Sequence, residues 1–505
     1  MMENLSFLPV LLPLLAGVTL LMPQFGKTKT NRRVTSVLLS IITFIVSLAL
    51  LLKVQAEGNQ MYAIGDWSAP FGIVLVADPL STLLVVLTAL LGLVCILYAC
   101  AGDDEHGSFF HPLVHFLVLG VNGAFLTGDA FNLFVFFEVL LIASYALLMH
   151  GGDKKNTQVA LQYVILNLVG SGVFLIALGI LYGVLGTLNM ADMALKVPLL
   201  QGDDVYLAKI GGLLLLVVFA LKAALLPLHL WLPNTYATAI PVVAALFAIM
   251  TKVGVYSMMR VYTLIFGDEA AQLSHIAQSL LWWLALATIA MGAIGVLASK
   301  DLRKLVANMV IISVGTLVAL IAVQSVEASS AAIFYLVHST LVTAALFMLA
   351  DLIARQRGSE SDRLIAGPAL AQPALLGVCF LIAAVAVIGM PPLSGFISKI
   401  WLLEATLNTQ YAFVFWPLYL VASLAILFCV SKAGSTLFWH HHGKPSVAAE
   451  QSRVHPAQLI AMLLLVVCAP LMSFFAGPFS EYATAAATEL HDVKTHIKLI
   501  IPGGQ

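Results

Sequence analysis

The chain has 505 residues, of which 61% are hydrophobic and only 10% are charged, and its mean hydropathy is +1.02. These values lie far outside the range of soluble proteins, so most of the chain is expected to lie in hydrocarbon as a polytopic membrane protein. The net charge of −1 argues against a nucleic-acid partner. The five cysteines lie in apolar stretches without a C-x-x-C pair, so no iron–sulfur cluster, disulfide framework or other cofactor is expected.

About fourteen hydrophobic segments follow one another along the chain, each close to the length of a membrane-spanning helix. Lipid admits only helices or closed barrels, so these segments predict an all-α bundle of about fourteen transmembrane helices. The first has no basic region before it and no cleavage site after it, which favours a retained span over a signal peptide. Their approximate limits are 5–24, 34–53, 80–101, 111–127, 129–149, 162–186, 207–230, 241–264, 276–297, 303–324, 329–354, 374–407, 412–437 and 457–476.

Two of these segments carry prolines near mid-depth. The seventh contains Pro227 and Pro233 in the stretch FALKAALLPLHLWLP, and the twelfth contains Pro391 and Pro392 in the stretch GMPPLSG. Proline removes a backbone donor and clashes with the preceding turn of a helix. Both segments are therefore expected to be discontinuous helices whose freed carbonyls need polar partners.

The two interrupted helices occupy similar places in two blocks of about five spans each. Breaks at corresponding positions are typical of transporters built from inverted repeats, with the functional site at the breaks. The expected organisation is three amino-terminal helices at 1–110, a first five-helix repeat at 111–264, a second at 265–437, and a final helix with a tail at 438–505.

Five ionisable side chains are expected near the bilayer centre. Lys222, Lys252 and Lys399 lie inside predicted spans, and Glu138 and His338 lie at similar depth. An ionised side chain there costs about 2.5 to 3.5 kcal/mol, and such residues usually mark an ion or proton path. The alternatives are that Lys222 only neutralises Glu138, and that His338 only bonds a neighbouring carbonyl.

Several polar residues beside these positions each have two alternative roles. His229, next to Pro227, could cap the broken helix or relay protons, and Glu404 could pair with Lys399 or lie near the interface. The tract His440–His442 is interpreted as a solvated loop, because clustered histidines alone fix no metal geometry.

His111 and His115 are four residues apart and would share one face of a helix, as a metal or haem pair might. No matching pair lies on a neighbouring span, which favours an interfacial role. Basic residues divide unevenly between the two sets of loops: fifteen, including Lys27 and Lys444, against six, including Arg260. Lysine and arginine concentrate on the cytoplasmic side, so both termini are expected on the outer side.

Four stretches of the sequence resemble a known family. They read GVNGAFLTGDAFNLFVFFEVLLIASYALL, FALKAALLPLHLWLPNTYATAIPVVAALFAIMTKVGVYSMMRV, SKDLRKLVANMVIISVG and GMPPLSGFISKIWLLEA. They are similar to the antiporter-like subunits shared by respiratory complex I and the multisubunit Mrp-type Na+/H+ antiporters. The resemblance runs from about Trp67 to Leu437, and WSAPFGIVLVADPLSTLLV and YLVHSTLVTAALFMLADLI are most similar to the branch of the Mrp D subunits.

The resemblance implies a proton path through Glu138, Lys222, Lys252, His338 and Lys399. It implies a transporter subunit rather than an enzyme, in a multi-pass bacterial plasma (inner) membrane assembly. The implied partners are the other subunits of a hetero-oligomeric antiporter, membrane lipid, protons, and Na+ with K+ or Li+ as alternatives. The alternative function is a proton-pumping subunit of a complex I type NADH dehydrogenase or membrane-bound hydrogenase, and a structural scaffold is a further alternative.

One departure from the family pattern concerns the eleventh span. Many complex I relatives carry a lysine a few residues after the histidine that matches His338, whereas residues 339–345 here contain only Ser, Thr, Leu, Val and Ala. The expected replacements for that lysine are Thr340, Thr343 and water.

Overall fold

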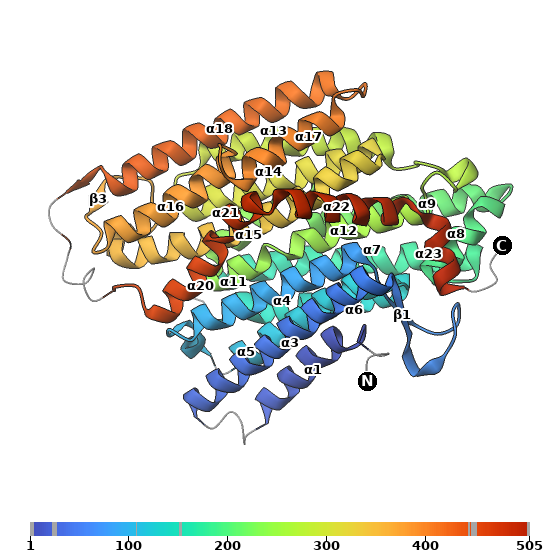
Figure 1. Cartoon of the computed structure of the whole chain (residues 1–505), viewed down its shortest axis with the longest axis horizontal. Helices are drawn as coiled ribbons and strands as arrows, with labels where there is room; N and C mark the ends of the chain where they lie inside the picture. The colour runs from blue at the N-terminus through green and yellow to red at the C-terminus, as the bar shows by residue number, and fades with distance from the viewer. Residues whose placement is uncertain are drawn as a thin grey trace.

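The computed structural model describes residues 5–22, 28–107, 109–150, 154–442, 445 and 452–501. In this part the chain is mostly helical, as predicted, and most helices run along one common direction (Figure 1). Lys27 and Lys444, two of the loop residues used to predict the orientation, lie outside the described residues. The α-helices are α1 (Leu8–Leu21), α3 (Lys29–Glu57), α4 (Pro79–Ala99), α5 (Phe110–Leu126), α6 (Ala130–Met149), α7 (Lys154–Leu185), α8 (Met190–Lys196), α9 (Asp203–Ala223), α10 (Trp231–Thr238), α11 (Pro241–Phe247), α12 (Met250–Leu264), α13 (Gln278–Ala298), α14 (Leu302–Val323), α15 (Val326–Arg357), α16 (Pro373–Ile388), α17 (Ser394–Thr406), α18 (Ala412–Phe438), α20 (Pro456–Val466), α21 (Cys468–Phe474), α22 (Ala476–His491) and α23 (Val493–Ile500).

Short elements connect the long helices. The strands β1 (Gln60–Ala63) and β2 (Val74–Ala77) form an antiparallel hairpin, and β3 (Gly367–Pro368) pairs in parallel with β4 (His441–His442). His440, His441 and His442 are exposed. The 3-10 helices are η1 (Ile64–Asp66), η2 (Asp103–His106), η3 (Val197–Leu199), η4 (Ala271–Leu273) and η5 (Gly358–Glu360).

Eleven helical segments of the described chain are long and apolar enough to cross a membrane. Three shorter apolar helices, α1, α5 and α16, lie among them. The prediction of a polytopic helical membrane protein is therefore confirmed. The crossing number of fourteen and the inverted relation of two repeats stay predictions.

Helix starts follow local sequence rules. Asp78 accepts a hydrogen bond from the backbone of Ser81, and its own backbone nitrogen donates to the Ser81 hydroxyl, with Pro79 at the first helical position of α4. Asp129 and Ser325 likewise cap α6 and α15 with a side-chain oxygen. Such caps satisfy orphan backbone donors and fix where each helix begins.

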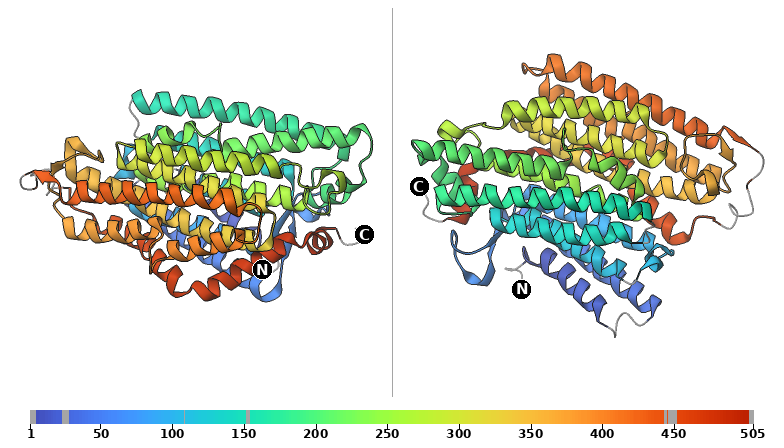
Figure 2. Two further views of the ribbon diagram at one scale, coloured as in Figure 1. Left: turned by 90° about the horizontal axis from the view of Figure 1, so that it is seen from above. Right: turned by 180° about the vertical axis from the view of Figure 1, so that it is seen from behind.

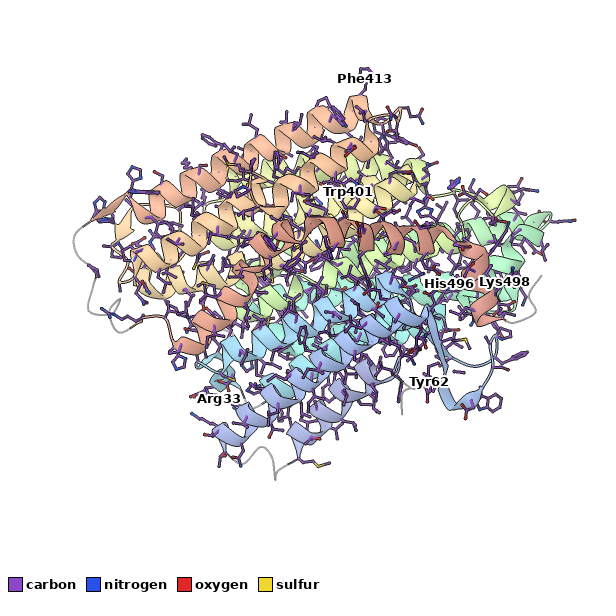
Figure 3. All side chains as sticks on the ribbon, viewed as in Figure 1. Arg33, Tyr62, Trp401, Phe413, His496 and Lys498 are labelled. Carbon is purple, nitrogen blue, oxygen red and sulfur yellow. The ribbon has the colours of Figure 1, made fainter. Side chains whose placement is uncertain are left out.

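Three long helical segments lie inside the bundle. The spanning parts of α12, α14 and α15 are almost wholly buried, whereas α3, α7 and α18 each leave a broad face uncovered. The uncovered faces carry large apolar side chains, such as Phe413 of α18, which points away from the bundle in Figure 3. In the left view of Figure 2, α7 (teal) forms one edge of the bundle. This arrangement suits a lipid solvent, because apolar side chains can face the hydrocarbon while polar ones cannot.

The two predicted helix breaks are present. α9 ends at Ala223, Ala224 adopts the left-handed conformation with φ 61°, and the chain turns until α10 begins at Trp231. Likewise α16 ends at Ile388 and α17 starts at Ser394, with Gly389 at φ 78°. Between α11 and α12 the backbone keeps helical dihedral angles at Ala248 and Ile249, so Pro241–Leu264 forms one span.

Candidate functional site

Lys222 lies at the end of α9, one residue before the last residue of the helix. Its side chain is buried, Nζ donates to Oδ1 of Asn167 at 3.2 Å, and it lies over the Phe137 ring at 5.8 Å from the centroid. The last carbonyls of a helix carry partial negative charge, which favours a cation in the final turn. The break therefore provides a buried environment that accepts an ammonium group.

The freed backbone groups at this break have partners. The Trp231 indole Nε1 donates to the carbonyl oxygen of Leu221 at 3.1 Å, and the backbone nitrogen of Leu226 donates to the Thr288 hydroxyl at 2.9 Å. His229 was one candidate for this capping role, but Trp231 fills it. Nδ1 of His229 is buried and has no hydrogen-bond partner among the described residues.

Glu138 on α6 is linked to Lys222 through α7 and not directly. Its carboxylate accepts a hydrogen bond from the Ser171 hydroxyl, and Asn167 lies one turn earlier on the same helix. The ion pairs between described residues do not include one between Glu138 and Lys222. Asn167 and Ser171 were not predicted as site residues. Their signal was a pair of polar residues four apart within an apolar span, which places them on one helix face.

Lys252 lies near the start of α12 and is also buried. Its Nζ donates to the Ser313 hydroxyl of α14 at 3.2 Å. One turn of α12 packs directly against the break of α9, where a Cβ on Gly254 would lie 2.7 Å from the backbone nitrogen of Ala223. The helices that carry Lys222 and Lys252 are thus in close contact, although no hydrogen bond between described residues joins the two lysines.

His338 and Lys399 meet the two sides of the second break. Nδ1 of His338 lies 2.8 Å from the Ser394 hydroxyl at the start of α17. Nζ of Lys399 donates to the carbonyl oxygen of Ile388, the last residue of α16, at 2.6 Å. Pro391 and Pro392 lie in the turn between these helices. Both lysines of the broken helices therefore lie beside a helix end.

A small cavity lies between Ser313, the partner of Lys252, and the residues at the second break. Its volume is about 20 Å³, and its lining includes Ser313, Tyr335, His338, Thr343 and Lys399. A cavity needs roughly 10 to 15 Å³ to hold one water molecule, so this one has room for a single bridging water. The partner of Lys252 and the side chains of His338 and Lys399 thus share one polar space.

Glu404 and Thr340 are not part of this space. Glu404 is exposed in a groove outside the bundle core and forms no ion pair with Lys399 among the described residues. The Thr340 hydroxyl donates to the carbonyl oxygen of its own helix at Leu336, 2.7 Å away. Of the two threonines expected to replace the missing lysine, Thr343 lines the cavity and Thr340 does not.

One sequence interpretation is corrected by the structure. Arg260, counted as a loop residue, is buried in α12 and forms an ion pair with Asp78. His111 and His115 lie in the first two turns of α5 and are buried within the protein, and their interfacial role stays a prediction. Both rings contact the Ser36 hydroxyl, at 3.0 and 3.1 Å, because α3 and α5 pack side by side in the amino-terminal bundle.

Comparison with known proteins gives a consistent family. Residues 127–426 match the family model described as NADH:quinone oxidoreductase/Mrp antiporter. The chain is 37% identical to the D subunit of a probable K+/H+ antiporter of Rhizobium meliloti, over 99% of this chain and 98% of that protein. It is also 37% identical to the D subunit of the Na+/H+ antiporter of Bacillus subtilis, over 99% of this chain and 100% of that protein.

Solved structures agree. The fold matches a chain of the Mrp complex from Dietzia sp. with a TM-score of 0.87 at 25% identity, over 99% of both chains. It also matches a chain of respiratory complex I from Thermus thermophilus with a TM-score of 0.80 at 25% identity, over 97% of this chain and 99% of that chain.

Proposed function

The chain belongs to the family of membrane subunits shared by NADH:quinone oxidoreductase and the Mrp antiporters, in the branch of the antiporter D subunits, and we propose that it conducts protons within a multisubunit monovalent cation/proton antiporter. The proposed path uses Glu138, Lys222, Lys252, His338 and Lys399 as proton-carrying groups. The crossing number is fourteen, in two inverted five-helix repeats at 111–264 and 265–437. Three helices precede them at 1–110, and 438–505 forms the last crossing and tail.

One observation carries the proposal. Lys222 and Lys399 each lie at a helix break, where the ammonium meets an amide or a backbone oxygen and, among the described residues, is paired with no carboxylate. A lysine in direct contact with a carboxylate stays charged, whereas a buried lysine whose nearest partners are neutral gives up its proton more readily. Two such lysines can therefore alternate between protonation states as neighbouring charges change.

The order of transfer follows the contacts. Glu138, Ser171, Asn167 and Lys222 form the first group. Lys252, Ser313, the water-sized cavity, His338 and Lys399 form the second group. A proton crosses between the groups where α9 and α12 are in contact, through water that reaches the broken helix.

The assembly is a hetero-oligomer in a bacterial inner membrane with both termini outside. One relative is named for K+ and another for Na+, so the transported cation is assigned here only as monovalent. The alternative is a proton-pumping subunit of a complex I type enzyme, since a complex I chain has the same fold. Co-purification of quinone-reducing or hydrogenase subunits would favour that alternative.

The experiment is Na+- or K+-dependent dissipation of a pH gradient in vesicles from antiporter-deficient cells that carry the whole complex. Lys222→Ala is compared with Lys209→Ala, an exposed lysine on the same helix. We expect normal assembly in both and loss of exchange only in Lys222→Ala. If Lys222→Ala still exchanges, the lysine is structural and the proton path is wrong.

A further inference from the structure

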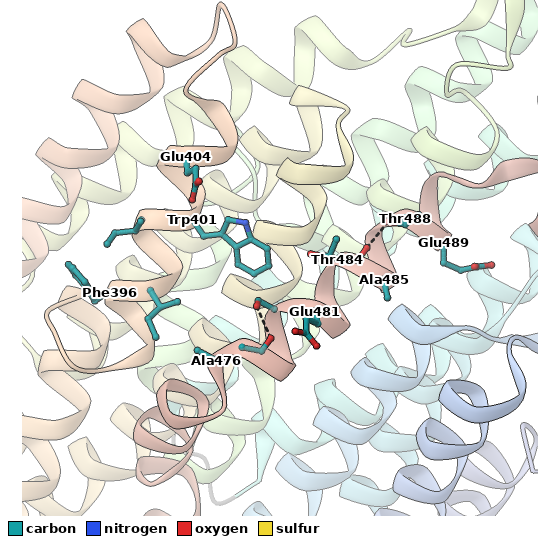
Figure 4. A pocket seen from close by; sticks show the side chains of 13 residues that line it. Phe396, Trp401, Glu404, Ala476, Glu481, Thr484, Ala485, Thr488 and Glu489 are labelled. Atoms are coloured by element: carbon teal, nitrogen blue, oxygen red, sulfur yellow. Dashed lines mark hydrogen bonds between the residues drawn. The ribbon is translucent and has the colours of Figure 1, made fainter.

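A groove of about 990 Å³ opens between α17 and α22 (Figure 4). One wall carries Ile400, Trp401 and Glu404 of α17, and the other carries Glu481 and Thr484 of α22. In Figure 4 the Trp401 ring stands between the two helices, below Glu404. The groove lies on the side of the bundle, apart from the two polar groups described above.

The base of the groove is closed by aromatic rings. Trp401 packs on Phe334 of α15, with ring centroids 5.7 Å apart, and Phe334 packs on Phe479 of α22 at 5.1 Å. Phe334 is eight residues into α15, which corresponds to about 12 Å from the start of that helix. Glu481, two residues after Phe479, therefore lies within the depth of the helical bundle and not beyond its end.

The outward face of α22 differs from the lipid-facing helices. Its exposed positions include Gly477, Glu481, Thr484, Ala485 and Thr488, which lie on one side of the helix at spacings of three and four. Small and polar residues on a membrane helix allow another helix to approach closely. These residues are therefore typical of a helix–helix contact and not of a surface that meets lipid tails.

The exposed face of α18 provides the comparison within the same molecule. It carries Phe413, Leu420, Val421, Leu424 and Phe428, all large and apolar. These residues suit contact with lipid tails. The contrast indicates that α18 faces lipid and that α22 faces another surface.

The charges of the groove need a partner. The carboxylates of Glu404 and Glu481 are exposed and form no ion pair or hydrogen bond with other described residues, while Glu489 at the far end bonds to Asn59. A carboxylate at membrane depth is unfavourable unless it faces water, a cation or a hydrogen-bond donor. A second copy of this chain would bring glutamate against glutamate, and an anionic lipid headgroup would be repelled.

We propose that the groove between α17 and α22 receives a transmembrane helix of a partner subunit, which presents a lysine or arginine side chain to Glu404 and Glu481. This inference rests on the hetero-oligomeric assembly proposed above. The small residues of α22 let the two helices approach, and the partner's basic side chain compensates the two carboxylates.

The test uses the complete purified complex. Thr484→Cys places a thiol in the groove, and a short maleimide–succinimide reagent then links that thiol to any amine within reach. We expect a cross-link to a lysine in a transmembrane helix of a different subunit, identified by its peptide mass. Leu424→Cys on α18 is the matched exposed control and should give no cross-link beyond those that the native cysteines of the parent complex give.

A second measurement covers a partner that uses arginine. The double substitution Glu404→Lys and Glu481→Lys should reduce the partner subunits recovered with this chain by about tenfold, because two charge contacts become repulsive. Lys209→Glu, at an exposed position of α9, should leave the recovery of the partner subunits unchanged.

Three results would overturn the proposal. The first is a cross-link only to lipid, and the second is a cross-link to a second copy of this chain. The third is unchanged recovery of the partner subunits with the Glu404→Lys and Glu481→Lys variant, together with a Thr484→Cys thiol that reacts freely with the reagent in the intact complex. None of these measurements requires transport. Failure here is therefore distinguishable from failure of the proton path.

Discussion

Lys222 is held by an amide and not by a carboxylate, and this has a chemical consequence. Asn167 is itself oriented, because its Nδ2 donates to the carbonyl oxygen of Tyr163 at 2.9 Å. Its Oδ1 is thereby turned to accept from Lys222. A neutral amine still has N–H groups to donate, so this contact persists in both protonation states. Lys222 can release a proton without losing its position.

The first prediction concerns that amide. Asn167→Leu keeps the size of the side chain and removes the acceptor, so the Lys222 ammonium loses a hydrogen bond worth about 1.5 to 3 kcal/mol. We expect cation-dependent proton exchange to fall at least about tenfold in vesicles that contain normal amounts of complex. Gln162→Leu, an exposed polar position on the same helix, is the control and should be near the parent rate. Equal rates for both variants would remove Asn167 from the path.

Asp104 is the buried acid that connects η2 to the amino-terminal helices. Burial by itself raises the pKa of a carboxyl group, but hydrogen bonds from Arg33 and His111 and their charges hold the pKa of Asp104 well below its usual range. A lowered folded pKa means that the carboxylate stabilises the fold above its ordinary pKa of about 4, and that this stability is lost as the pH falls toward the folded pKa.

The second prediction follows from the lowered pKa of Asp104 in the folded protein. Asp104→Asn should lower the unfolding free energy by about 3 kcal/mol at pH 7, because Arg33 loses its buried counter-charge. The difference from the parent should shrink below about pH 4, because the Asp104 carboxyl of the unfolded parent then takes up a proton and unfolding becomes more favourable. Thermal unfolding of the purified complex at several pH values measures this. Asp203→Asn, an exposed acid at the start of α9, should change little at any pH, and a difference that is constant down to about pH 3 would contradict the argument.

The charged residues could be predicted from the sequence, and their uncharged partners could not. A lysine in an apolar span is conspicuous, so Lys222, Lys252 and Lys399 stood out. Asn167 and Ser313 did not, because uncharged polar residues are common in membrane helices and only the fold shows which of them face a lysine. Arg260 was counted with the loops although it falls in the span predicted at 241–264, and its counter-charge, Asp78, is far away in the sequence, so only the fold shows the pair.

At the scale of elements, the prolines predicted where two helices break. The helix before the first break ends several residues ahead of its proline, and the geometry of the proline ring explains why. Pro227 lies in the turn, but α9 already ends at Ala223. The proline ring clashes with the carbonyl four residues earlier, and that residue is Ala223. Ala248 and Ile249, between α11 and α12, have no proline beside them and keep helical dihedral angles, which agrees with the same rule.

The third prediction tests the packing of α12 on the broken end of α9. Gly254→Ala would place a methyl group 2.7 Å from the backbone nitrogen of Ala223, so the two helices must separate. We expect a loss of about 1 to 3 kcal/mol in unfolding free energy. Exchange should also fall, because Lys222 and Lys252 move apart.

Gly183→Ala is the matched control for this substitution. It is a helical glycine in α7 with open space around the added methyl group. Its thermal unfolding and exchange should equal or slightly exceed those of the parent, since alanine favours helix more than glycine does. If Gly254→Ala behaves in the same way, the contact between α9 and α12 has no role in transfer.

At the scale of the whole molecule, three successive acids in η2 hold separate parts of the bundle together. Asp103 pairs with Arg355 of α15, Asp104 pairs with Arg33 of α3, and Glu105 pairs with Lys29 of α3. Arg355 also reaches Asp351 on its own helix, 2.7 Å away. This one turn of 3-10 helix therefore ties the amino-terminal helices to the helix that carries His338.

The fourth prediction concerns this tie. Arg355→Met leaves Asp103 and Asp351, both buried, without their shared cation, and breaking a buried pair in this way costs about 3 to 5 kcal/mol. Thermal unfolding of the complex should show a loss of that order. Arg363→Met removes an exposed arginine whose carboxylate contact is 3.9 Å, and it should change stability by less than about 0.5 kcal/mol. Equal effects of both substitutions would show that η2 is only a surface turn.

The burial of charged side chains also bears on biosynthesis. A charged helix that leaves the insertion machinery is unstable in lipid until a polar partner is found. For three buried cations that partner has been made already: Asp78 precedes Arg260, Asp103 precedes Arg355, and Asn167 precedes Lys222. Lys252 and His338 must wait, because Ser313 and Ser394 are synthesised later. The polar space around the second break is therefore completed only after α14 and α17 have entered the membrane.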